Sequence, residues 1–131
     1  MSNHARGDFT VQMQPLSSAP AEGLMRFSMN KEIHGDLEAT SQGEMISAGD
    51  PKNGEAGYVA IERVTGTLAG KSGGFVLQQT ATMHAGGYDL RVIITPGSGA
   101  GALAGITGTF VITIANGRHS YDLEYTLPVS E

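Results

Sequence analysis

The sequence predicts an all-β protein, a closed eight-stranded antiparallel up-and-down barrel, and three observations support this fold class. Apolar residues alternate with polar ones at the two-residue period of half-buried strands. Nineteen glycines lie between these segments without a regular period, as turn residues do. No segment has the spacing of an amphipathic helix. A barrel is favoured over an open sheet because closure leaves no unpaired edge, and a two-sheet sandwich is the alternative.

The N-terminal third contains three expected strands, over residues 7–14, 24–33 and 37–47. In the first strand Phe9, Val11 and Met13 alternate with polar residues, and Pro15 ends the pattern because it has no N–H to donate. A short turn over residues 34–36 joins the second and third strands as a hairpin.

Five further strands are expected in residues 58–68, 75–83, 88–95, 109–115 and 118–127. Glycine-rich turns connect most of them, and Asn116-Gly117 is the strongest two-residue hairpin signal in the chain. Residues 47–57 contain so many turn formers that we expect an exposed, mobile loop there. Every connection is short enough for antiparallel neighbours, which favours a meander.

Length and composition indicate one barrel domain over residues 1–131, with a flexible tail over residues 1–6. The net charge of −5 provides no basic stripe, so nucleic acid is not an expected partner. The absence of cysteine excludes disulfides and thiolate metal sites. The N-terminus lacks the continuous apolar run of a signal peptide, and no later apolar run approaches the length of a membrane span. We therefore expect a cytoplasmic protein without a membrane partner.

No motif for a cofactor or a metal is present, and we expect neither. Residues 97–105 are rich in glycine, but they lack the Gly-Lys-Ser/Thr ending of a phosphate loop, and a strand follows them instead of a helix. They are interpreted as a turn at the barrel rim. The four histidines, at positions 4, 34, 84 and 119, include no His-x-His pair. No Gly-x-Ser-x-Gly nucleophile motif occurs either.

Five segments resemble a known family. They are YVAIERVTGTL (residues 58–68), GFVLQ (74–78), PGSGAGALAG (96–105), HGDLE (34–38) and YDLEY (121–125). From residue 8 onward the chain resembles the bacterial domain-of-unknown-function family 3224, whose members look like small barrels of the allene oxide cyclase type. The resemblance implies a meander barrel with a lipocalin-like outline that assembles as a homo-oligomer.

The resemblance implies less about activity, because the bacterial family has no settled function. Its better-known relatives, the plant cyclases and the dirigent proteins, hold unstable hydrophobic intermediates inside the barrel. No site residue of the cyclases matches this sequence one by one, so no catalytic role is transferred, and fold analogy by itself is weak evidence for function.

The strand over residues 58–68 is unusual because each of its faces contains a charged residue. Glu62 shares a face with Tyr58, whereas Arg63 lies opposite with Ile61. One of these two charges must therefore lie among apolar neighbours. If Glu62 faces the lumen, it is a candidate proton donor or acceptor, or a polar anchor for a ligand hydroxyl or carbonyl. The equally weighted alternative is a structural ion pair with an arginine, for example Arg91, or a place in a subunit interface.

The candidate ligand-binding residues are polar side chains that share a face with apolar ones. They are Tyr58, Glu62, Gln79, Tyr121 and Tyr125. An apolar lining with a few polar groups is typical of small-molecule pockets. Ordinary core packing with satisfied hydroxyls is the alternative for each residue.

Three functions remain open from the sequence. The favoured one is binding of a small hydrophobic molecule in the barrel lumen. The first alternative is a cyclase- or isomerase-type enzyme that confines a reactive hydrophobic substrate and uses Glu62 or a tyrosine for proton transfer. The second is a structural, oligomeric protein with a solidly packed barrel. A cavity below roughly 300 Å³ would favour the last.

Overall fold

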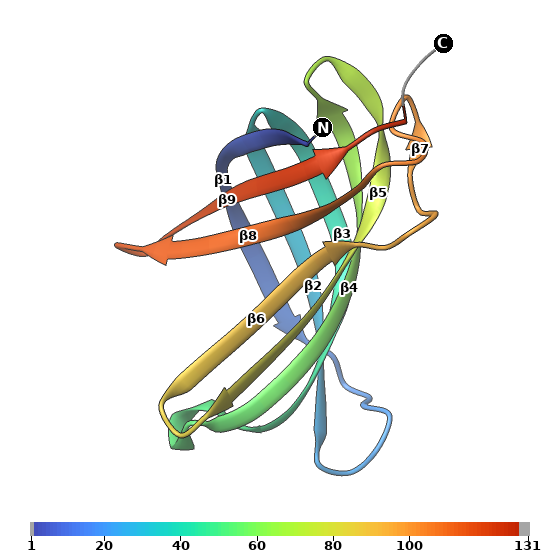
Figure 1. Ribbon diagram of the computed structural model, residues 1–131. Coiled ribbons are helices and arrows are strands. Elements are labelled where there is room, and N and C mark those ends of the chain that lie inside the picture. The colour runs from blue at the N-terminus through green and yellow to red at the C-terminus, as the bar shows by residue number, and fades with distance from the viewer. Residues whose placement is uncertain (1, 129–131) are drawn as a thin grey trace.

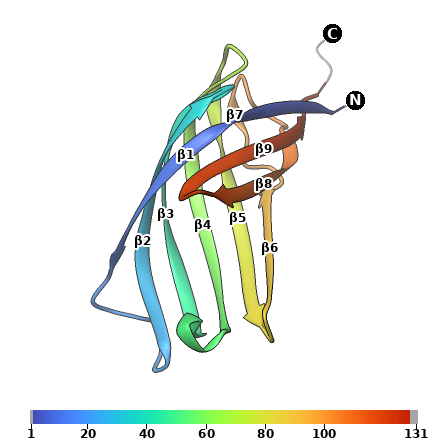
Figure 2. The same cartoon turned by 90° about the vertical axis from the view of Figure 1, so that its left-hand side faces the viewer.

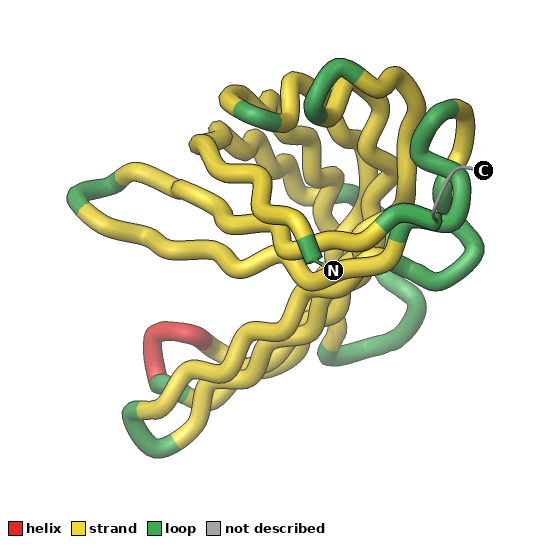
Figure 3. The backbone as a smooth tube through the Cα atoms, turned by 45° about the horizontal axis from the view of Figure 1, so that its top comes forward, coloured by secondary structure: helices red, strands yellow, loops and turns green. Residues whose placement is uncertain are grey.

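The computed structural model describes residues 2–128, which form nine β-strands and one short 3₁₀ helix (Figure 1). The strands are β1 (Asn3–Pro15), β2 (Leu24–Gly35), β3 (Leu37–Asp50), β4 (Glu55–Leu68), β5 (Lys71–His84), β6 (Gly87–Ile94), β7 (Ala100–Gly101), β8 (Thr107–Ala115) and β9 (Arg118–Thr126). The helix η1 (Pro51–Asn53), red in Figure 3, lies at the tip of the β3–β4 hairpin.

Eight of the strands close into an antiparallel barrel, which confirms the predicted fold class. Each of β1 to β5 pairs with the next strand, β6 pairs with β8, β8 with β9, and β9 pairs back with β1. The two-residue strand β7 is additional and lies in the glycine-rich stretch expected at the rim. It pairs with Gly73 and Gly74 of β5, where a close backbone approach leaves no room for a side chain on Gly73.

The first strand begins earlier than expected. Residues 3–6, expected within a flexible tail, form the start of β1 and pair with β9, for example Asn3 with Tyr125. Ala5 is buried at 1% exposure, so the ladder and the core hold this segment. Met1 lies outside the described residues.

The prediction of a mobile loop over residues 47–57 was wrong for most of its length. The β3–β4 ladder continues to the pair Asp50–Glu55, and only residues 51–54 form the turn. The Asp50 side chain accepts a hydrogen bond from the Lys52 N–H at 2.9 Å, and Gly54 takes the left-handed conformation with φ of 74°. The turn-forming residues on either side of this turn adopt strand conformation instead, because pairing between β3 and β4 provides hydrogen-bond partners for their backbone N–H and C=O groups.

The barrel wall is uneven, because one of its seams is almost unpaired. Only Ile93 and Thr109 pair between β6 and β8. The β8 and β9 strands have 9 residues each, whereas β3, β4 and β5 have 14. The β8–β9 hairpin therefore diverges from β6 (Figure 1), and it crosses only the upper part of the row of strands β2 to β6 in Figure 2.

The two ends of the barrel differ as a result. The packed end, which contains the β2–β3 and β4–β5 turns, is filled by fully buried apolar side chains, among them Phe75, Leu77, Phe110 and Leu123. Leu103 and Ile106, from the segment between β6 and β8, are 1% exposed and join this core. The opposite end, with the β3–β4 and β5–β6 turns, is called the open end below.

On the outer surface, Val59 and Ile61 of β4 and Val111 of β8 are more than half exposed. The homo-oligomer expected from such outward apolar residues stays a prediction. Among residues 2–128 no helix is both long and apolar enough to cross a bilayer.

Candidate functional site

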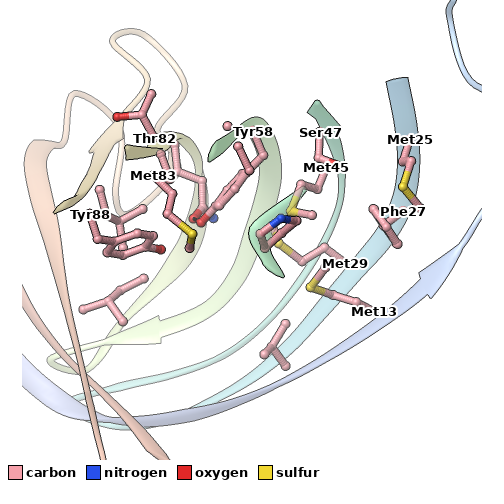
Figure 4. A pocket seen from close by; sticks show the side chains of 18 of the residues that line it. Met13, Met25, Phe27, Met29, Met45, Ser47, Tyr58, Thr82, Met83 and Tyr88 are labelled. Atoms are coloured by element: carbon pink, nitrogen blue, oxygen red, sulfur yellow. Dashed lines mark hydrogen bonds between the residues drawn. The ribbon is translucent and has the colours of Figure 1, made fainter. Parts of the chain in front are cut away.

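The open end contains a cavity of about 510 Å³. Aliphatic and aromatic side chains dominate its lining, and every methionine of the described residues takes part. These are Met13, Met25, Met29, Met45 and Met83. Figure 4 shows Met29, Met45 and Met83 around the same space as Tyr58 and Tyr88. The volume exceeds the roughly 300 Å³ at which drug-sized pockets begin, so the barrel is not packed solid.

Four polar side chains from neighbouring strands form a buried cluster at the inner end of the cavity. The Lys31 ammonium lies 2.9 Å from Glu62 Oε2, and Gln79 Nε2 donates to the same oxygen at 2.9 Å. Ser41 Oγ donates to Glu62 Oε1 at 2.7 Å. All four residues are at most 5% exposed. This Lys31–Ser41–Glu62–Gln79 group is called the polar cluster below.

The polar cluster marks the border between the two ends because its members take inward positions on β2, β3, β4 and β5. Two residues further toward the packed end, the inward positions hold buried apolar residues such as Ile33, Val64 and Leu77. Beside Glu62, the paired position of β3 is Gly43, where a Cβ atom would lie 2.6 Å from the Glu62 Cα. A glycine there lets β3 and β4 approach closely.

The structure decides the orientation of the Glu62–Arg63 pair: Glu62 faces inward and is 2% exposed, whereas Arg63 is exposed on the outer face. An ion pair is present, but its cation is Lys31 and not Arg91, which is exposed on β6. Three donors occupy both oxygens of Glu62, which is itself not among the cavity-lining residues. Glu62 therefore holds the Lys31, Ser41 and Gln79 side chains in place, and its role as an acid or base stays a prediction.

Two of the predicted ligand-binding residues, Tyr58 and Gln79, do line the cavity. The Tyr58 hydroxyl donates to Gln79 Oε1 at 3.2 Å, which connects the tyrosine to the polar cluster. Burial, together with the nearby Tyr88 hydroxyl and the Glu62 carboxylate, raises the pKa of Tyr58 far above its usual range. Tyr58 is therefore a neutral hydroxyl at physiological pH.

The other two predicted tyrosines lie elsewhere, at the packed end, and do not line the cavity. Tyr121 stacks on Phe110 with ring centroids 5.0 Å apart. Its hydroxyl donates to the His34 carbonyl at 2.9 Å and accepts from the Leu37 N–H at 3.1 Å, while burial raises its pKa. Tyr125 is a buried member of the same core. Both tyrosines therefore agree with the alternative of ordinary core packing.

Sequence reasoning missed Lys31, Ser41 and His119. Met25, Phe27, Met29 and Lys31 are spaced by two residues and therefore share the inward face of β2. This spacing alone was enough to predict a lysine among apolar side chains. His119 likewise precedes the inward Tyr121 by two positions, and its ring centroid lies 5.2 Å from that of Phe9 at the cavity wall. The partner of Lys31 could not have been found, because it lies two strands away.

The other three histidines each contact a carboxylate at the surface, in the pairs His4–Asp122, His34–Glu38 and His84–Glu55. Within the described part of the chain, no three His, Asp or Glu side chains come together as a group that could hold a metal ion. The side chains that can form hydrogen bonds in this mostly apolar cavity are Lys31, Ser47, Tyr58, Gln79, Thr82, Tyr88 and His119.

Comparisons with known proteins agree with this fold. The crystal structure of a protein of unknown function from the DUF3224 family of Shewanella oneidensis MR-1 is 41% identical, with a TM-score of 0.91. The match covers 99% of this chain and 100% of that one. No curated protein matches the sequence. The family model described as "Protein of unknown function (DUF3224)" matches residues 5–125. The chain therefore belongs to the DUF3224 family, as the sequence motifs predicted.

Proposed function

We propose that the protein binds a small hydrophobic molecule in the cavity at the open end of the barrel, without transforming it. The observation that carries this proposal is the cavity of about 510 Å³, whose lining is apolar except for a few convergent polar groups. Small-molecule sites have this combination of size and lining.

The methionines define what kind of molecule fits. A thioether side chain is flexible and polarizable, so it adapts to irregular apolar shapes. Met25 and Met13 are 55% and 42% exposed at the mouth, whereas Met29 is 4% exposed deeper inside. The site therefore suits a compact apolar body that enters from the open end and reaches the polar cluster.

The two alternatives from the sequence receive less support. The cyclase- or isomerase-type enzyme, and with it the allene oxide cyclase-like assignment, stays a prediction, and its named acid or base, Glu62, is engaged with Lys31, Ser41 and Gln79. A solidly packed barrel does not agree with the cavity volume. Confinement of a reactive substrate would still need a group that touches the reacting atoms.

The proposal is tested with the neutral apolar dye N-phenyl-1-naphthylamine, whose fluorescence rises in apolar surroundings. We expect saturable binding to the wild type. Ala81→Phe, which adds a ring at a cavity-lining position of β5, should abolish it. The matched control Thr80→Phe adds the same ring on the exposed outer face of β5 and should bind normally. Native mass spectrometry of the purified protein searches for a copurified ligand.

The proposal fails if the wild type shows no saturable dye binding, or if the inward and outward phenylalanine variants lose binding equally. Circular dichroism of both variants confirms that the barrel has formed before their affinities are compared.

A further inference from the structure

We infer that the ligand's polar group is an uncharged hydrogen-bond acceptor, such as a carbonyl or ether oxygen, that binds the Lys31 ammonium, and that the cavity discriminates against carboxylates. This inference rests on the proposed function and adds the chemical class of the ligand. It follows from the hydrogen-bonding capacity and the charge balance of the polar cluster.

The hydrogen-bond donors of the Lys31 ammonium group are only partly used. An ammonium group carries three N–H donors, and within residues 2–128 the bond to Glu62 is the only hydrogen bond that Lys31 donates to a side chain. Its nitrogen also lies 5.0 Å from the centroid of the Phe9 ring, which together with Glu62 fixes its position. Lys31 lines the cavity, so a molecule that fills its inner end contacts this side chain.

The neighbouring polar groups also offer more donors than acceptors. The Gln79 oxygen accepts from Tyr58, and one N–H of its amide is used by Glu62, which leaves the second N–H and one lone pair of the oxygen. Both oxygens of Glu62 are occupied. A ligand acceptor is therefore the group that this inner end can satisfy best.

Charge balance decides between a neutral acceptor and an anion. The Lys31 charge is already neutralised by Glu62 at 2.9 Å, and the side chains of this ion pair are 3% and 0% exposed. The cavity lining contains no second lysine or arginine, and its one histidine, His119, lies beside Phe9 with ring centroids 5.2 Å apart. A ligand carboxylate would bring a second negative charge beside the one cation that Glu62 uses, and an uncompensated charge in an apolar enclosure is strongly unfavourable. A carbonyl oxygen adds no net charge.

The test compares three eight-carbon molecules, 2-octanone, octane and octanoate, by displacement of the neutral dye at pH 7. The affinity of 2-octanone relative to octane is measured in the wild type and in the double variant Lys31→Met/Glu62→Leu, which replaces the ion pair by apolar side chains. Removing one hydrogen bond should reduce this relative affinity about fivefold to tenfold. Replacing both partners together avoids an unpaired buried charge, but it removes the acceptor of the buried Ser41 and Gln79 donors. Circular dichroism therefore confirms that the barrel has formed before the affinities are compared.

A second variant reverses the charge balance. Glu62→Gln keeps the shape of the side chain but leaves the Lys31 charge uncompensated, so the affinity for octanoate relative to 2-octanone should rise by about tenfold or more. Glu32→Gln makes the same change of net charge at an exposed position of β2 and is the matched control, with no expected change in the ratio.

The inference is overturned if the wild type binds octanoate more tightly than 2-octanone, or if neither the double variant nor Glu62→Gln changes the ratios while the dye still binds. Such a result leaves the hydrophobic cavity as a binding site without the proposed head-group recognition. If the dye itself does not bind, the proposed function fails together with the inference.

Discussion

The packed end and the open end of the barrel are built from the same strands, but they use their inward positions differently. At the packed end these positions hold Phe75, Leu77 and Leu123, all at 0% exposure, and Leu103 closes the core from the segment after β6. At the open end they hold methionines and tyrosines around a cavity of about 510 Å³. Close packing at the packed end stabilises the fold, whereas the open end leaves space that side chains do not fill.

The position of the border follows from strand length. The β8–β9 hairpin reaches only to the pair Phe9–His119 on the β1 side, so the last residues of β1 pair with β2 alone. Where the hairpin is present, eight strands surround the core. The hairpin contributes only Ile112, Ile114 and His119 to the cavity lining, so there are too few side chains to fill the interior there, and the polar cluster lies at that transition. The short β8–β9 hairpin therefore divides the barrel interior into a packed core and a cavity.

The largest expected difference between the two ends is in the cost of truncating an apolar side chain. Phe75→Ala should lower the free energy of unfolding by about 3–5 kcal/mol, because it removes a fully buried ring from a close-packed core. Met25→Ala, at a side chain 55% exposed at the cavity mouth, should stay within about 1 kcal/mol of the wild type. Urea unfolding followed by circular dichroism measures both, since the chain contains no tryptophan. Equal costs would contradict the division into two ends.

A smaller difference is expected between the hydroxyls of two tyrosines. Tyr121→Phe leaves the buried Leu37 N–H without its acceptor and should cost about 1–3 kcal/mol. Tyr88→Phe, at a residue 56% exposed beside the cavity, should change stability by less than about 0.5 kcal/mol. The same unfolding measurement applies, and a larger loss for Tyr88→Phe would show that the open end depends on its hydroxyls as the core does.

The smallest effects should be alike at the two ends, because they concern exposed carboxylates at hairpin turns. The Gly35 N–H and His34 hold the pKa of Glu38 below its usual value at the packed end, and the Ala85 N–H and His84 do the same for Glu55 at the open end. A depressed folded-state pKa gives stability that is present above the unfolded value of about 4.3 and is lost as the pH falls through the folded value.

NMR titration of the two carboxyl groups measures these pKa values directly. Glu38→Gln and Glu55→Gln should each reduce stability slightly at pH 7 and have no effect well below pH 4, because the wild-type carboxyls are then protonated in both the folded and unfolded states. If the effect on stability depends more strongly on pH for one of the two variants, the carboxyl group at that end is more buried than the other.

The alternation of polar and apolar residues was enough to predict the strand order and the turns of most hairpins, because a strand displays its period locally. It failed at the ends of elements. Residues 3–6 and 48–50 contain few apolar residues, and their pairing with β9 and β4 depends on neighbours far along the chain. The candidate site was predicted in part, since Tyr58 and Gln79 line the cavity whereas Tyr121 and Tyr125 lie in the core.

The sequence by itself determined that the chain forms a β-barrel, that it belongs to its family, and that either Glu62 or Arg63 lies among apolar side chains. Only the tertiary structure decided that Glu62 is the inward one, that its partner is Lys31, and that a cavity lies on one side of that pair. The physical reason is that a two-residue period distinguishes two faces but does not say which one is inside. That choice is made by closure of the barrel, in which β9 pairs with β1. Pairing of β3 with both β2 and β4 then brings a lysine and a glutamate 31 positions apart within 2.9 Å.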